Sequence, residues 1–151
     1  MLAVIVLIVV LAVLAAAGLT VWTRRAAACG RKIGAPAGQP ERVLMGDVMC
    51  RSVITSGSFA RLEIHDWGVR LRGIVITRWI VPTWEARYDE LAIAEVVASR
   101  TRLGVWLRLK DGAGGIGFLS NVSEATIDPL ERHGVPINRS VARLRQVADL
   151  Y

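Results

Sequence analysis

The sequence predicts a mainly β domain with α-helix at its C-terminal end, attached to an N-terminal transmembrane helix. Residues 1–22 contain no charged side chain. From about Val43, apolar residues recur at every second position, and from Ser123 they recur at helical spacing. These three observations divide the chain into a transmembrane helix at 1–23, a basic juxtamembrane segment and linker at 24–42, a β-domain with a closing helix at 43–137 and a C-terminal amphipathic helix at 138–151.

The N-terminal segment is long enough to cross a bilayer. A helix rises 1.5 Å per residue, so this run measures about 33 Å against a hydrocarbon core of ~30 Å. Trp22 stands where an interfacial aromatic residue is expected, and Arg24 and Arg25 stand at headgroup level. The alternative is a cleaved signal peptide, with Ala26–Cys29 as a processing or lipidation site. We favour an uncleaved anchor because the run is longer than a signal peptide needs and the arginines separate it from that site.

The flanking charges predict an orientation. No Lys or Arg precedes the helix, whereas Arg24, Arg25, Arg31 and Lys32 follow it. The positive-inside rule then places the N-terminus outside and the C-terminal domain in the cytoplasm, at the inner (plasma) membrane. Together with Trp22, these four cations form the predicted membrane interface, and each adds about 1 kcal/mol of attraction to anionic lipid. In the cytoplasm, Cys29 and Cys50 are expected to be free thiols.

The linker from Gly30 to Pro40 has no apolar period and is expected to be disordered or extended. Beyond it, Ala60, Leu62 and Ile64 share one face of a half-buried strand. Asp66–Gly68 is a turn signal, after which a second alternating segment completes a hairpin. Further strands are predicted at 84–89, 91–99, 105–110 and 116–118. The pattern is typical of an antiparallel meander.

Two helices are predicted after the strands. Ser123 is a suitable N-cap for the first helix, and Gly134 followed by Pro136 ends it. The second helix is expected from about Arg139, since the apolar side chains after it share one helical face. These apolar residues are Val141, Leu144 and Ala148.

The order of these elements resembles bacterial pleckstrin-homology-like domains between Val53 and Ile137. The resemblance is carried by packing and turn residues, namely Ala60–Ile64, Trp67–Leu71, Gly104–Val105, Ile116–Phe118 and Val135–Ile137. It implies a partly open antiparallel barrel of two orthogonal sheets with a helix across one end. The chain departs from that pattern in its extra C-terminal helix and in the long apolar stretch from Thr77 to Thr83.

The same resemblance implies candidate ligands for a phosphorylated headgroup. Members of the superfamily often bind phosphoinositides through basic residues on the first hairpin, and Arg61, Arg70 and Arg72 match that placement. Arginine forks supply the convergent donors that a phosphate needs. The three residues also occupy the solvent positions of alternating strands, where charged side chains are expected in any case. We therefore favour a solvated strand face over a headgroup site.

Little in the sequence indicates catalysis. Cys50, His65 and Asp66 include the residue types of a nucleophile and its base, but no spacing brings them together. The glycine-rich segment 111–117 lacks the Lys-Ser/Thr of a phosphate-binding loop. No catalytic residue, cofactor or metal is therefore expected. The tryptophans after the anchor are expected in the core or at a barrel rim, and packing is favoured over lipid contact for Ile80–Val81.

The function expected from these features is a membrane-anchored, non-catalytic binding or scaffolding module. It would face the cytoplasm and recognise a protein partner or membrane headgroups. Nucleic acid is not expected as a partner, because four of the cations behind the net charge of +6 are juxtamembrane. The alternatives are a structural accessory subunit docked on a larger membrane complex through both terminal helices and, after that, a membrane-tethered enzyme.

Overall fold

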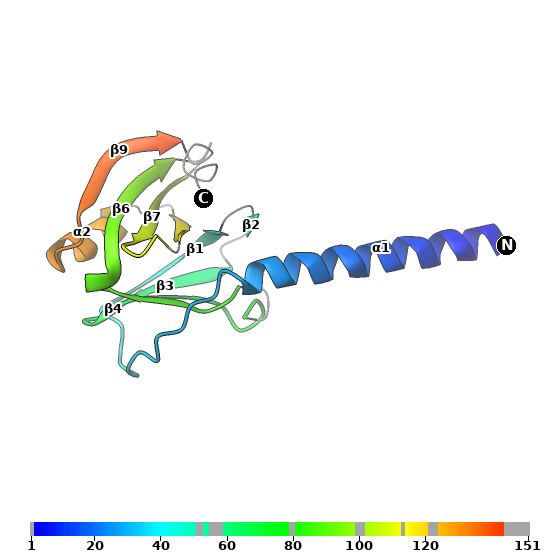
Figure 1. Ribbon diagram of the computed structural model, residues 1–151, viewed down its shortest axis with the longest axis horizontal. Coiled ribbons are helices and arrows are strands. Elements are labelled where there is room, and N and C mark those ends of the chain that lie inside the picture. The colour runs from blue at the N-terminus through cyan, green and yellow to red at the C-terminus, as the bar shows by residue number, and fades with distance from the viewer. Residues whose placement is uncertain are drawn as a thin grey trace.

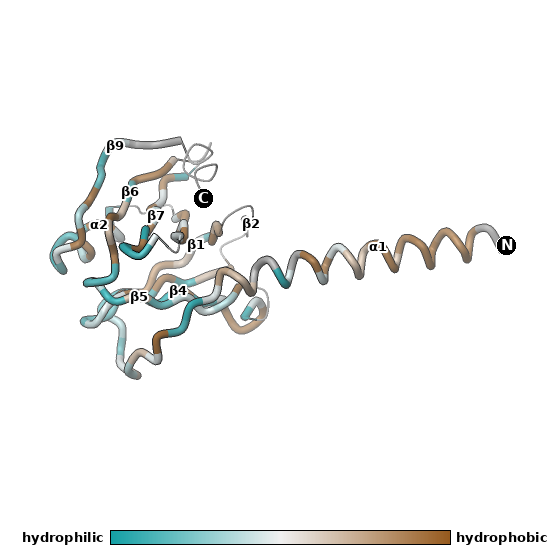
Figure 2. The backbone as a smooth tube through the Cα atoms, in the orientation of Figure 1, coloured by the Kyte–Doolittle hydropathy of each residue, from teal (hydrophilic) through white to brown (hydrophobic). Residues whose placement is uncertain are grey.

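In the computed structural model, a long N-terminal helix projects from one end of a β-rich domain (Figure 1). The structure describes residues 2–50, 53–54, 59–78, 81–98, 102–112, 114–120 and 124–143. The helix, α1 (Leu2–Ala27), is hydrophobic over most of its length (Figure 2). Its window Val4–Val21 has a mean hydropathy of 3.1, and none of that window is buried in the protein. By length and composition, α1 can therefore cross a membrane.

The rest of the described chain is mainly β-strand, as the sequence predicts. The strands are β1 (Arg42–Cys50), β2 (Val53–Ile54), β3 (Ala60–Ile64), β4 (Gly68–Gly73), β5 (Trp84–Arg87), β6 (Leu91–Ala98), β7 (Leu103–Leu109), β8 (Gly115–Ser120) and β9 (Ile137–Arg143). Two short helices, η1 (Tyr88–Glu90) and α2 (Glu124–Arg132), complete the order. Within the described residues, nine strands form one open sheet in the order β5-β4-β3-β1-β8-β7-β6-β9, and β2 pairs with β1.

Strand β1 joins the two halves of this sheet. Its first part, Arg42–Gly46, pairs with β3, and its second part, Asp47–Met49, pairs with β8. Gly46 lies at the point of change, where a Cβ atom would come within 2.7 Å of the Phe118 ring and closer still to the backbone oxygen of Leu119. A glycine at this position therefore lets β1 pass closely over β8.

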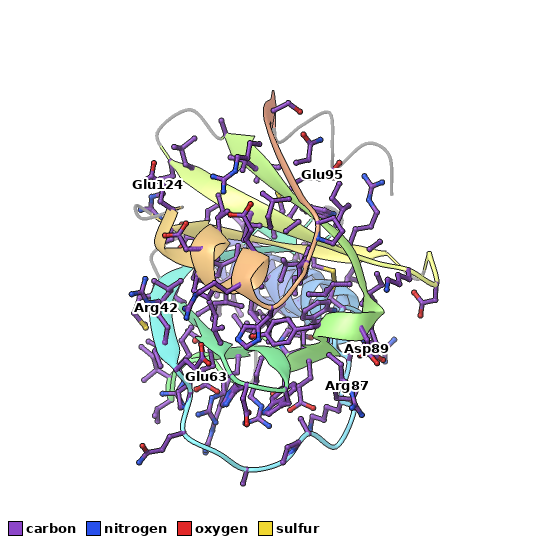
Figure 3. The ribbon with its side chains drawn as sticks, turned by 90° about the vertical axis from the view of Figure 1, so that its left-hand side faces the viewer. Arg42, Glu63, Arg87, Asp89, Glu95 and Glu124 are labelled. Carbon is purple, nitrogen blue, oxygen red and sulfur yellow. A yellow bond between two sulfur atoms is a disulfide. The ribbon has the colours of Figure 1, made fainter. Side chains whose placement is uncertain are left out.

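The core lies between the two halves of the sheet. Leu62 and Leu71 are fully buried on one half, and Leu107 and Phe118 are fully buried on the other. Helix α2 lies across the opening between the halves (Figure 3), and its Leu130 belongs to the same apolar cluster. The alternation in the sequence thus correctly identifies the core faces of β3, β4 and β7.

Helix α2 ends where the sequence predicts. Gly134 adopts a φ of 79°, a left-handed conformation that glycine adopts without a Cβ penalty. Its N–H donates to the carbonyl of Glu131 at 2.9 Å, and the N–H of Val135 donates to the carbonyl of Leu130 at 3.0 Å. The predicted N-cap, Ser123, lies outside the described residues.

The predicted C-terminal amphipathic helix at 138–151 is wrong over residues 138–143. These residues belong to β9, which pairs parallel with β6 through partners such as Ala94 and Ile137. The exposed edge of β6 offers unpaired backbone groups, and the β-branched Ile137 and Val141 suit a strand, so this pairing outweighs a weak helical pattern. Residues 144–151 lie outside the described part of the chain.

Candidate functional site at the junction of the helix and the β-domain

The first link at the base of α1 is a disulfide. Cys29, two residues after the helix, is bonded to Cys50, the last residue of β1. Their Cα atoms are 6.2 Å apart, within the usual range for a disulfide. The expectation of two free thiols is therefore wrong for this structure. The reason is that β1 runs toward the end of α1, a meeting that a separation of 21 residues does not reveal.

The second link is an ion pair between the linker and η1. The Arg31 guanidinium reaches both carboxylate oxygens of Glu90, at 2.7 Å and 3.2 Å. These bonds from Arg31 lower the pKa of Glu90. The backbone of Arg31 also pairs with β5, because its N–H donates to Thr83 and its carbonyl accepts from Glu85. The linker is therefore extended, and its first residues are part of the fold.

The third link is the buried carboxylate of Glu85. It accepts the backbone N–H of Ile33 at 3.1 Å and the Nε of Arg70 at 2.8 Å. Burial by itself would raise the pKa of Glu85, but the hydrogen bonds from Ile33 and Arg70 outweigh it and lower the pKa. Beyond these contacts the linker loops away from the sheet and turns back into β1 (Figure 1).

A cavity of about 450 Å³ lies at the same junction. Its walls come from the segment after α1, the end of β1, β5 and the β7–β8 hairpin; they are Ala28, Cys29, Gly30, Arg31, Cys50, Trp84, Trp106, Leu109, Gly112, Gly114 and Gly115. The glycine-rich hairpin, which the sequence indicates is no phosphate loop, thus forms one wall of this cavity. No cluster of His, Cys, Asp and Glu suited to a metal occurs among the residues that the structure describes.

The predicted membrane-interface residues do not all face outward. Arg24 and Lys32 are exposed. Arg31 is instead held by Glu90, with only 27 % of its side chain exposed. The side chains of Trp22 and Arg25 lie outside what the structure describes. Arg31, predicted to face lipid, therefore forms an ion pair within the protein at the junction.

The three candidate headgroup arginines lie on one face, and each is ion-paired. Register places Arg61 opposite Arg72, and Glu63 opposite Arg70. Glu63, labelled in Figure 3, has a side chain that is 3 % exposed. Its Oε1 lies 2.7 Å from both Arg61 Nε and Arg72 Nη2. Arg70 pairs with Glu85. Sequence reasoning missed both glutamates as partners, although their alternation with the arginines was a usable signal.

The residues considered for nucleophilic catalysis do not form a catalytic group. Cys50 is held in the disulfide and is not a nucleophile in this state. His65 is buried and stacks on Trp67, with ring centroids 5.0 Å apart, while Asp66 is exposed. Glu63 Oε2 lies 3.5 Å from His65 Nε2. His65 is thus a packed side chain on the arginine face, without the arrangement that nucleophilic catalysis requires.

The tryptophans serve largely in packing. Trp84 and Trp106 are buried, and the ring of Trp67 lies 5.4 Å under the Arg70 guanidinium. Val81 is buried, in agreement with a packing role, whereas Trp79 and Ile80 lie outside the described residues. The sequence matches no protein-family model and no curated protein.

Proposed function

We propose that the chain is a membrane-anchored, non-catalytic binding and scaffolding module whose β-domain recognises a protein partner. The observation that carries the proposal is the junction. The Cys29–Cys50 disulfide, the Arg31–Glu90 pair and the bond from Ile33 to Glu85 follow one another within a few residues of α1. A flexible tether would let the domain tumble above the bilayer. A junction held by these three links instead presents the faces of the domain at a fixed height and angle relative to the bilayer, as scaffolding requires.

The proposed domain type is pleckstrin-homology-like. Its support is the pair of sheet halves joined through β1, with α2 across the opening between them. The added edge strand β9 is a departure from that pattern.

A protein partner is favoured over a headgroup by the state of the arginine face. Two buried glutamates, Glu63 and Glu85, already neutralise most of the charge of Arg61, Arg70 and Arg72. A phosphate would have to displace carboxylates that lie 2.7–2.8 Å from those arginines. Headgroup recognition therefore competes with bonds that already hold the face together.

Vesicle binding separates the protein and headgroup readings. The full chain is reconstituted, and its enrichment of anionic lipids of equal charge is compared between the wild type and Arg72→Ala. We expect no preference among those lipids in either protein, apart from general attraction that fades with salt. A headgroup preference in the wild type that Arg72→Ala abolishes would show that the arginines form a lipid site instead.

The two other readings have less support. An enzyme would need an acid, base or nucleophile in its cavity. The titratable side chains that line the junction cavity are Arg31, which is paired with Glu90, and Cys29 and Cys50, which are joined in the disulfide. A structural accessory subunit docked through both terminal helices would need an amphipathic C-terminal helix. Residues 138–143 lie instead in β9.

We propose further that the chain lies in the inner (plasma) membrane with its N-terminus outside and the β-domain in the cytoplasm. The support is the group of cations after α1, of which Arg24 and Lys32 are exposed. The Cys29–Cys50 disulfide favours the opposite side, since disulfides persist mainly in oxidising compartments. In a cytoplasmic domain this pair is open to reduction, and the Arg31–Glu90 pair and the bond from Ile33 to Glu85 then hold the junction.

Thiol accessibility decides the orientation. A Tyr151→Cys substitution is made in a background carrying Cys29→Ser and Cys50→Ser, so that the new thiol is the only one. Intact cells are treated with a membrane-impermeant thiol reagent. Protection until the membrane is opened supports the cytoplasmic placement, and labelling of intact cells overturns it.

A further inference from the structure

The turn between β4 and β5 exposes two adjacent apolar side chains. Val75 is 80 % exposed and Ile76 is 66 % exposed, more than any other large apolar residue described outside α1. Single exposed apolar residues are ordinary on a protein surface. Two β-branched neighbours held outward at the tip of one turn are a feature that calls for a partner surface.

The structure holds this turn in a defined shape. The N–H of Ile74 and the hydroxyl of Thr77 both donate to the carbonyl of Phe59, at 3.1 Å and 2.6 Å. The N–H of Val81 donates to the carbonyl of Thr77 at 2.8 Å, and the side chains of both residues are buried. These bonds hold the two ends of the turn against the rest of the domain.

The β4–β5 connection lies at the base of the membrane helix. The N–H of Arg31 donates to the carbonyl of Thr83 at 3.0 Å, and a Cβ on Gly30 would lie 3.1 Å from the Cβ of Pro82. The connection lies on the side of the domain from which α1 projects (Figure 1), and an apolar stretch of chain is seen there (Figure 2). The apolar turn therefore faces the same way as the apolar helix.

Helix length places the base of α1 in the headgroup region of the bilayer. After the apolar window Val4–Val21, α1 continues to Ala27, which adds about 9 Å of helix. The headgroup region on one side of a bilayer is about 5–8 Å thick. The base of α1 thus lies near the outer edge of the headgroups. Arg78 is exposed at the end of the turn, as are Arg24 and Lys32 at the base of α1.

We propose that the turn Val75–Arg78 is a second membrane contact. Val75 and Ile76 enter the boundary between headgroups and acyl chains in the leaflet from which α1 emerges, and Arg78 stays among the headgroups. The occupant of this surface is the lipid bilayer. The inference rests on the proposed function in one respect, that α1 spans the membrane. A second contact beside the helix stops the whole protein from rotating about the axis of α1 in the membrane, which a single helix cannot do.

Fluorescence quenching by lipid-attached nitroxides tests the contact in the full chain, reconstituted in vesicles of phosphatidylcholine and phosphatidylglycerol. Each probe cysteine is introduced in a background carrying Cys29→Ser and Cys50→Ser, so that it is the only thiol that accepts the probe. Arg78→Cys carries the probe at the turn, and Val13→Cys carries it within α1. Asp66→Cys is the matched control, since it is exposed in the β3–β4 turn, at the opposite end of the same two strands.

We expect strong quenching at position 13, clear quenching at position 78 by nitroxides near the headgroups, and none at position 66. Adding Val75→Glu and Ile76→Glu to the Arg78→Cys protein should remove most of the quenching at position 78. Quenching at position 78 that equals the control, or that survives the two glutamates, overturns the second contact while α1 still spans. Absence of quenching at position 13 instead contradicts the transmembrane anchor of the proposed function.

Discussion

Arg31 Nη2 lies 2.7 Å from Glu90 Oε1, and this contact ties the segment after the membrane helix to η1, which follows β5. The pair spans 59 positions of sequence, so it forms only when the β-domain is folded. Together with the disulfide and the bond to Glu85, it makes the segment after α1 part of the domain. Anchor and domain are therefore expected to behave as one body.

Removing the disulfide should weaken the junction without unfolding the helix. A protein with Cys29→Ser and Cys50→Ser is expected to lose about 2–4 kcal/mol of unfolding free energy, as is usual when a native disulfide is removed. Urea unfolding of the full chain in detergent, followed by tryptophan fluorescence, measures the loss. A reductant should lower the stability of the wild type by a similar amount and leave the double variant unchanged. Equal stability of all three states would contradict the link.

The stability of the domain should fall in acid because of Glu85 and Glu90. Both carboxylates have a pKa below the ordinary value of 4.5 in the folded protein. The unfolded chain therefore binds protons first as the pH falls, and the stabilisation present above about pH 4.5 is lost through the folded-state pKa values. Unfolding measured from about pH 7 to about pH 3 should show this loss. Its pH dependence should be smaller in Glu85→Gln, and an unchanged slope would count against the role of Glu85.

Glu63 should matter more to stability than either arginine that it binds. Glu63→Gln leaves Arg61 and Arg72 facing each other without a counter-charge, and we expect a loss of about 1–3 kcal/mol. Arg61→Gln or Arg72→Gln alone should cost less than about 1 kcal/mol, because their side chains are 36 % and 41 % exposed. Chemical unfolding of the three single variants gives the comparison. A neutral Glu63→Gln would mean that the face does not depend on its buried carboxylate.

The close approach of β1 to β8 at Gly46 should tolerate no side chain at that position. Gly46→Ala places a methyl group against Phe118 and the backbone of β8, so a loss of about 1–3 kcal/mol is expected from overpacking. Gly38→Ala is the matched control, since a Cβ there meets no atom within 4 Å. Its effect should stay within about 0.5 kcal/mol. Thermal unfolding of the two proteins side by side is sufficient, and equal stabilities would contradict the close passage of β1 over β8.

The alternation of apolar residues predicted the hairpin of β3 and β4 because each of these two strands turns one apolar face into the core. Leu62 and Leu71 point into the core as that pattern requires, and Gly134 ends α2 as its lack of a Cβ allows. The strand β9 was mispredicted because its conformation depends on the edge of β6, which lies about 40 positions earlier. Short patterns report local preference, and an edge pairing of this kind is not local.

The site was harder to predict than the fold for a similar reason. The pairing of Cys29 with Cys50 and of Arg31 with Glu90 depends on how the linker returns to the domain, which no local pattern encodes. The two-residue period correctly set the three arginines on one strand face. That face is not simply solvated, because Glu63 and His65 on it are buried. The partners of these arginines follow from strand register, which sets Glu63 opposite Arg70 and Arg70 opposite Glu85. The pairing register of β3, β4 and β5 can be predicted from the sequence only after the hairpin turns have been assigned.

Crosslinking in living cells tests most directly whether the β-domain is a protein-binding module. A photoreactive amino acid is placed at an exposed position of the domain, such as Asp66 or Met45, in the full chain expressed at its native level. The account predicts a discrete protein adduct that forms again when the purified partner and the reconstituted chain are mixed. The adduct should persist in Arg72→Ala. Adducts to lipid alone, selective for one headgroup and lost in Arg72→Ala, would contradict the account.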